Sequence, residues 1–156
     1  MPIEQEPNNN SASANSLTLG TSMTGQLATS TDVDWYRFTT TSAGSLSIVL
    51  DVPTSSTYSD YFRVGLYDAT SGALMNSYLT GSDKTFQTAV PGAGSYFLAI
   101  DVPSYNYSGS SYSVTANLVA GSVAGFESEP NNASTTADAL TLGTSMTGQL
   151  ATSTDV

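Results

Sequence analysis

Four side chains near the start of the chain carry oxygen atoms at a spacing that suits metal binding. Glu4, Glu6 and Asn8 alternate with other residues in the stretch EQEPNN, and Asn9 follows directly. In an extended segment, residues two apart point to the same side, and Pro7 favours extended angles at Glu6. Asn9 can then turn the chain so that its own amide oxygen points inward. The spacing predicts four oxygen ligands that converge from one short arm.

A second acidic pair, Asp32 and Asp34, precedes the segment WYRF. If the arm folds back on the rest of the domain, this pair lies beside it and raises the number of ligand residues to the level that calcium requires. Mixed carboxylate and amide oxygens favour calcium over magnesium, which prefers to keep its water. Histidine and cysteine are both absent, so the commonest zinc ligands are missing. We therefore expect a Ca²⁺ site.

Two other interpretations of the acidic residues have to be weighed. Asparagine-rich turns after proline are common in loops, and an aspartate before a strand is often a turn cap. Carboxylates clustered without a lysine or arginine nearby, however, cost free energy unless a cation compensates them. Catalysis is not expected, because a glycosidase pair would flank a cleft from separate elements. A serine hydrolase would need a histidine or a GxSxG motif.

The acidic motif belongs to an internal repeat. ESEPNN returns at 127–132, and LTLGTSMTGQLATSTDV at 17–33 recurs unchanged at 140–156. The second copy predicts a partial metal site without a counterpart of Asp34. Its residues are Glu127, Glu129, Asn131, Asn132 and Asp155.

The repeat predicts the organisation of the chain, which we interpret as a slice of a tandem array. We expect a metal-binding linker arm at 1–14, a β-sandwich repeat at 15–119, a flexible linker at 120–125 and the first quarter of the next repeat at 126–156. This last segment presents apolar side chains and an unpaired strand edge. It could therefore exchange with the identical segment of another copy, as a domain swap or a head-to-tail chain. The apolar side chains are Leu140, Leu142, Met146 and Leu150.

The pattern of the full copy predicts an all-β fold. About eight short segments alternate apolar and polar residues, and turn formers separate them, which is typical of two packed antiparallel sheets. We predict a jelly-roll-like β-sandwich with no helix longer than a turn or two. The expected core residues are Tyr36, Phe38, Leu46, Ile48, Leu50, Val64, Leu66, Leu98, Ile100, Val114 and Leu118.

Charge and composition limit the partners. The net charge is −10 with three basic residues, so phosphate backbones would be repelled, and nucleic acid is an unexpected partner. No apolar run is long enough for a membrane span. Low charge and abundant serine, threonine and glycine suggest a large secreted or cell-surface bacterial protein. Met1 and Pro2 do not begin a signal peptide, so we expect the export signal to lie outside this sequence.

A ligand-binding module is the alternative function. The loops DVPTSSTYSDY and DVPSYNYSGSSY echo each other, and their tyrosines could form an aromatic platform for sugar rings or a protein strand. The same rings could instead pack over the ends of the sandwich. The residues concerned are Tyr58, Tyr61, Tyr105 and Tyr107.

Six motifs, in one order over residues 4–118, resemble the bacterial pre-peptidase C-terminal domain, a family that includes the collagen-binding domains of clostridial collagenases. They are ExEPNN, GQL followed by DVDWYRF, GSLSIVL, LYDATSG, PGAGSYFLAI and YSGSSYSVTA. The resemblance implies a non-catalytic β-sandwich appendage of secreted proteins, which binds calcium in some members. It places Glu4, Glu6, Asn8, Asn9 and Asp34 on ligand positions. The chain departs from some members at Thr31, where they carry an acid, so Asp32 is the least secure ligand.

Overall fold

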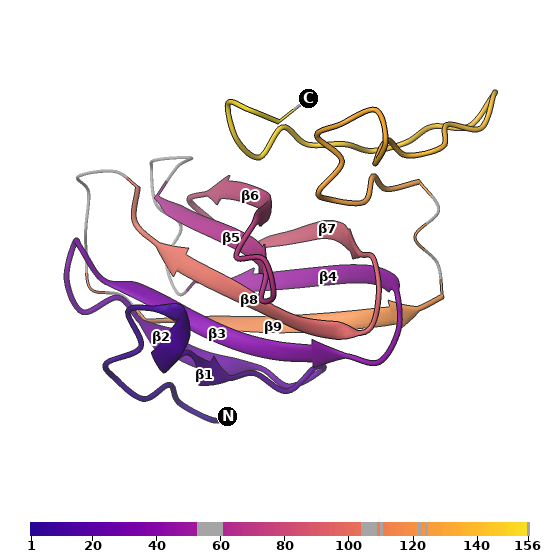
Figure 1. Cartoon of the computed structure of the whole chain (residues 1–156). Helices are drawn as coiled ribbons and strands as arrows, with labels where there is room; N and C mark the ends of the chain where they lie inside the picture. The colour runs from indigo at the N-terminus through magenta and orange to yellow at the C-terminus, as the bar shows by residue number, and fades with distance from the viewer. Residues whose placement is uncertain (53–60, 104–108, 110, 122, 124, 156) are drawn as a thin grey trace.

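The computed structural model describes residues 1–52, 61–103, 109, 111–121, 123 and 125–155. They form two β-sheets packed face to face, as Figure 1 shows. The described helical structure is one short 3-10 turn, η1, at Ser11–Ser13. The strands are β1 Asn15–Ser16, β2 Met23–Gln26, β3 Val33–Thr40, β4 Gly44–Asp51, β5 Phe62–Asp68, β6 Leu74–Thr80, β7 Lys84–Val90, β8 Gly94–Asp101 and β9 Ser111–Ala120.

The strand order confirms the β-sandwich that the sequence predicts. One sheet has the order β1-β3-β8-β5-β6 and the other β2-β9-β4-β7. All pairings are antiparallel except that of β1, a two-residue strand that runs parallel to β3. The predicted segments correspond to β2–β9. The sequence does not reveal β1, because two residues are too few to show alternation.

The core lies between the two sheets and follows from alternation along the strands. In β4 every second residue is buried, and β3 buries its even-numbered residues from 34 to 40. Ten of the eleven predicted core residues are buried. Leu118 is partly buried and packs against the edge of the cluster, since it lies near the end of β9.

The N-terminal arm folds back onto the edge of the four-stranded sheet. Glu4 N donates to Thr24 O and Thr24 N donates to Pro2 O, each at 3.0 Å, so the arm forms a parallel bridge beside β2. Further along, Trp35 N at the start of β3 donates to Asn8 O at 3.1 Å. The arm therefore contacts a strand from each sheet.

Residues 126–155 lie at the other side of the sandwich, beyond β6 and β7, as Figure 1 shows in orange and yellow. The two backbone hydrogen-bonding groups of Ser77 on β6 bind the side-chain amide of Gln149. Among the described residues, no helix has the length and apolar character that crossing a membrane takes.

The core is expected to carry the stability of the domain. Replacing Ile48, which is fully buried in β4, with alanine should lower the free energy of unfolding by about 2 to 5 kcal/mol, because it removes packed methyl groups and leaves a cavity. Leu79→Ala on β6 is the matched control, since that side chain is 54% exposed and should cost about 0.5 kcal/mol or less. Urea unfolding measures both, and equal losses would contradict the assignment of the core.

Candidate metal centre

Three carboxylates meet where the arm crosses the sandwich. Glu4, Glu6 and Asp34 each offer an oxygen atom, and these atoms lie within 4.8 Å of one another. The backbone contacts of the arm with β2 place the glutamates. Asp34 comes from the start of β3, where the alternation of the strand points its side chain inward. Tertiary folding thus brings together both halves of the predicted acidic constellation.

Three hydrogen bonds hold the two glutamates of the arm. Glu4 Oε1 accepts from Gln26 N at 2.5 Å, and Glu4 Oε2 accepts from Asn8 Nδ2 at 3.3 Å. Glu6 Oε2 accepts from Asn8 N at 2.9 Å, and the Glu6-Pro7 peptide bond is cis. These contacts close the arm into a compact loop whose carboxylates face β3.

Two buried tyrosine hydroxyls complete the network from the sandwich side. Tyr36 donates to Glu4 Oε2 and Tyr112 donates to Asp34 Oδ2, each at 2.5 Å, and the two hydroxyl oxygens are 2.7 Å apart. The sequence predicts Tyr36 as a core residue and predicts no role for Tyr112. The one available signal was that tyrosine, and not phenylalanine, occupies these alternating apolar positions.

Gly25 on β2 makes room for these hydroxyls. A β-carbon at this position would lie 2.6 Å from the Tyr112 ring and would also overlap the Tyr36 hydroxyl. Any side chain would therefore displace the two tyrosines from Glu4 and Asp34.

Two oxygen atoms in the cluster are buried and have no hydrogen-bond partner. They are Asn8 Oδ1 and Asp34 Oδ1, and both residues are fully buried. Such atoms normally find a donor in a folded protein. The three basic side chains have other partners or lie elsewhere. Arg63 pairs with Asp101, and Arg37 donates to Ser95. Lys84 lies on β7, at the edge of the four-stranded sheet opposite β2. The orphaned oxygens and uncompensated carboxylates fit a hard cation.

Burial disfavours the charged forms of the carboxylates. It raises the pKa of Asp34 from 3.8 to about 8, opposed by the hydrogen bond from Tyr112 and reinforced by the charges of Glu4, Asp32 and Glu6. The pKa of Glu4 is also raised, chiefly by burial. A bound cation would favour the charged forms and reverse this effect.

Asp32 is not one of the three carboxylates of the cluster, and Asn9 contacts Asp32. Asp32 Oδ2 accepts from Ala28 N at 2.6 Å and Oδ1 accepts from Val33 N at 3.0 Å, so this carboxylate closes the turn before β3. Oriented to satisfy its neighbours, the Asn9 amide donates to Asp32 Oδ1. The turn-cap interpretation therefore describes the hydrogen bonds of Asp32.

The second copy reproduces the hydrogen bonds of the arm. Glu127 N donates to Thr147 O at 3.0 Å, Asn131 N to Glu129 Oε2 at 3.1 Å, and Ala151 N to Asp155 Oδ2 at 2.7 Å. Each bond has its counterpart in the first copy. Glu129 Oε1 and Asn131 Oδ1 are buried without a partner, and Asn132 is exposed.

One further carboxylate lies near the second arm and is not among the predicted site residues. Asp138 Oδ2 accepts from Ser128 N at 2.8 Å and from Asn131 Nδ2 at 3.2 Å. The first copy has Asn15 at this position, where its Oδ1 accepts from Gln5 N. The replacement of an amide by an acid between the copies was a visible signal. Burial, together with the charges of Asp155, Glu127 and Asp138, raises the pKa of Glu129.

The aromatic platform of the alternative function is only partly described. Tyr58, Tyr105 and Tyr107 lie outside the described residues. Tyr61 is buried and packs edge-on against Phe62, with ring centroids 4.7 Å apart. Tyr61 is thus a core residue and does not offer the exposed ring that a platform requires.

The fold and the cluster define a β-sandwich module with an acidic arm docked on it. The sequence matches no family model and no curated protein. A solved structure, the pre-peptidase C-terminal domain of a collagenase from Bacillus anthracis, is similar, with a TM-score of 0.54 and 18% identity. The match covers 73% of this chain and 100% of that one. The chain therefore has the fold of a pre-peptidase C-terminal domain, as the motifs of the sequence predict.

Asp34 should make the metal-free protein less stable as the pH rises. Its pKa is 3.8 in the unfolded chain and about 8 in the folded protein, so between these values the folded state binds more protons. With a chelator present, the free energy of unfolding should fall as the pH rises from about 4 to about 8. Urea unfolding across this range measures the slope, and Asp34→Asn should flatten it. A stability that increases with pH in the unmodified protein would contradict this.

Proposed function

We propose that the domain binds calcium between its N-terminal arm and β3, and that this ion stiffens the linker between repeats. The observation that carries the proposal is the pair of buried, unpartnered oxygens on Asn8 and Asp34 within a cluster of carboxylates. Calcium takes carboxylate and amide oxygens at flexible geometry. Glu4 and Glu6 would supply further ligands from the arm, and Asn9 and Asp32, which contact each other, would join by rearranging their side chains.

The positions of the ligands explain how an ion would stiffen the array. Glu4, Glu6 and Asn8 belong to the arm, whereas Asp34 belongs to the sandwich. An ion bound to both fixes the arm to the domain that follows it. Without the ion, the arm is held by hydrogen bonds alone, namely its backbone bridge to β2, the bond from Trp35 N to Asn8 O and the bond from Tyr36 to Glu4. Successive domains would then be joined by a looser tether.

The same features favour a non-catalytic module of a secreted or cell-surface protein, such as a spacer or adhesin repeat. The carboxylates of the cluster gather around one point, whereas a glycosidase pair flanks the scissile bond. The chain has no histidine to activate a serine. The similar solved structure is the pre-peptidase C-terminal domain of a collagenase. Extracellular fluid, which is rich in calcium, suits such a site.

Calcium binding is expected to stabilise the domain and to require Asp34. At free calcium about a hundred times the dissociation constant, an ion that binds only the folded state adds about 2.7 kcal/mol to the free energy of unfolding. Asp34→Asn should abolish this gain, because it removes a buried carboxylate from the cluster. Asp51→Asn is the matched control, since Asp51 is exposed at the end of β4. Calorimetry and urea unfolding with and without chelator test the proposal, and the absence of calcium binding would refute it.

The second arm supports a contact between successive repeats. The amide of Gln149 binds both backbone groups of Ser77 on β6, which is the edge strand of the five-stranded sheet. Phe126, Thr147 and Gln149 enclose a cavity of about 190 Å³ with Asn76 and Tyr78. The edge of β6 is thus the surface on which the next repeat would rest, and its position would set the angle between domains.

The second copy also has an apolar surface that could drive self-association. Leu140, Met146 and Leu150 correspond to Leu17, Met23 and Leu27, which are buried in the first copy. In the second copy Leu140 is 67% and Leu150 75% exposed. Burying a leucine is worth roughly 1.5 to 3 kcal/mol. The segment would gain that burial by occupying the β2 position of another molecule, although the resident segment there has an identical sequence.

Removing residues 133–156 should therefore leave a monomeric domain that still binds calcium, because the first copy retains its whole arm and sandwich. The complete chain should associate at high concentration through its second copy. Light scattering over a concentration series measures the difference, and calcium calorimetry on the shortened chain is the control. A complete chain that stays monomeric, with rapid hydrogen exchange in 140–150, would rule out the exchange.

A further inference from the structure

The outer face of the five-stranded sheet carries a shallow cavity that the calcium proposal does not use. It measures about 320 Å³ and lies over β3, β8 and β5. Asn9 and Val33 form part of its rim. Its floor and walls come from Trp35, Arg63, Gly65, Tyr67, Ala99 and Asp101.

The register of the sheet explains why a hollow forms here. Trp35 is paired with Ala99, which is paired in turn with Gly65, so two small residues lie side by side in one row. The neighbouring row on one side holds Asp101 and Arg63, and the row on the other side includes Tyr67. Small residues between rows of long side chains leave a trough across three strands.

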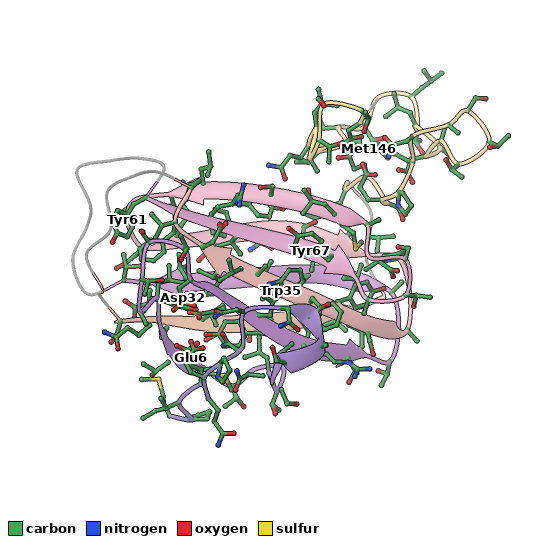
Figure 2. The ribbon with its side chains drawn as sticks, turned by 60° about the vertical axis from the view of Figure 1, so that its left-hand side comes forward. Glu6, Asp32, Trp35, Tyr61, Tyr67 and Met146 are labelled. Carbon is green, nitrogen blue, oxygen red and sulfur yellow. The ribbon has the colours of Figure 1, made fainter. Side chains whose placement is uncertain are left out.

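The aromatic wall of this trough depends on Gly65. A β-carbon at that position would lie 2.8 Å from Cε2 of Tyr67, so a glycine is needed for the ring to lie where it does. The ring centroids of Trp35 and Tyr67 are 5.0 Å apart with the planes at 35°, and Phe97 meets Trp35 edge-on at 5.7 Å. Figure 2 shows Trp35 and Tyr67 next to each other over the sheet. All three aromatic residues are only partly buried.

The opposite wall is polar but has no net charge. Arg63 donates two hydrogen bonds to Asp101, one of them from Nε to Oδ1 at 2.9 Å. The Arg63 side chain remains 49% exposed. A guanidinium has five N–H donors and a carboxylate has several acceptor lone pairs, so both groups keep capacity for a ligand. One of the three basic residues of the chain is thus placed, already neutralised, at this cavity.

We infer that this trough binds a neutral, polyhydroxylated ring, such as one sugar unit of an uncharged oligosaccharide. The C–H face of such a ring is apolar and matches the faces of Trp35 and Tyr67. The hydroxyls on its edge can accept from Arg63 and donate to Asp101. An aromatic surface with a few convergent polar groups is typical of small-ligand sites. An anionic ligand is disfavoured because the chain has a net charge of −10 and the positive charge of Arg63 is compensated.

This site lies on strands and differs from the tyrosine-rich loops of the sequence analysis. The cavity is lined by none of the three carboxylates that form the acidic cluster. The inference therefore does not rest on calcium binding. Because Asn9 of the arm forms part of the rim, calcium is kept in the buffer so that the arm stays in one state.

Trp35 allows a direct test because it is the only tryptophan of the chain. We would titrate the whole protein with cellohexaose, xylohexaose, maltohexaose and chitohexaose, and follow tryptophan emission. At least one of these neutral probes should give a saturable change. An anionic oligogalacturonate and a triple-helical glycine-proline-proline peptide serve as competing ligand classes, and neither should bind more tightly.

Variants assign the change to the trough. Arg63→Met should weaken binding about tenfold or more, equivalent to about 1.4 kcal/mol, and Tyr67→Leu should weaken it similarly. Arg37→Met is the matched control, since Arg37 is exposed on β3 of the same sheet but does not line the cavity. In the unmodified protein, the amide resonances of Gly65 and Ala99 should shift with the same saturation, which keeps the test valid if a variant does not fold.

Three outcomes would overturn the inference. The first is the absence of any change in emission or amide shift with the neutral probes up to about 10 mM, which lies beyond the weak end of specific binding. The second is binding that both Arg63→Met and Tyr67→Leu leave intact. The third is tighter binding of the anionic probe or of the peptide, which would assign the trough to a different ligand class.

Discussion

The architecture depends on one buried chain of hydrogen bonds, from Glu4 through Tyr36 and Tyr112 to Asp34. Glu4 lies on the arm, Tyr36 on β3 of one sheet and Tyr112 on β9 of the other. These hydrogen bonds therefore join the two sheets and the N-terminal arm at a single point. Buried polar groups in such a network are costly unless each finds a partner. This requirement accounts for the glycine at position 25, which leaves the two hydroxyls the space they occupy.

The same point carries the unbalanced charge of the domain. Three carboxylates come together without an ion pair to any described basic side chain, and burial raises the pKa of Asp34 and Glu4. Burial disfavours the charged forms and a bound cation favours them, so docking of the arm and metal binding are coupled through one set of oxygens. The second copy repeats the local hydrogen bonds of the arm. The arm is therefore preorganised by its own sequence, whereas the third carboxylate of the cluster, Asp34, comes from the sandwich.

The two faces of β3 contribute to two different sites. Residues with even numbers point to the interior, and two of them, Asp34 and Tyr36, join the polar network. Trp35 points outward and forms the end of the trough on the five-stranded sheet. Trp35 N also donates to Asn8 O, so the arm contacts the backbone of the same strand. Alternation along one strand thus places an interior site and a surface site within two residues of each other.

The sequence by itself determined the elements whose signals are local. Alternation of apolar residues predicts β2–β9 and their core, and the spacing of Glu4, Glu6 and Asn8 predicts a shared direction for the three side chains. Only the tertiary structure decided which groups meet. Asp34 joins the arm while Asp32 turns to Ala28 and Val33, and Tyr61 enters the core. The tyrosine hydroxyls and the trough beside Trp35 arise from strands that are distant in the chain. Local patterns indicate which face of a strand a residue occupies. Its neighbours depend on sheet order and register, which are set by the packing of the whole domain.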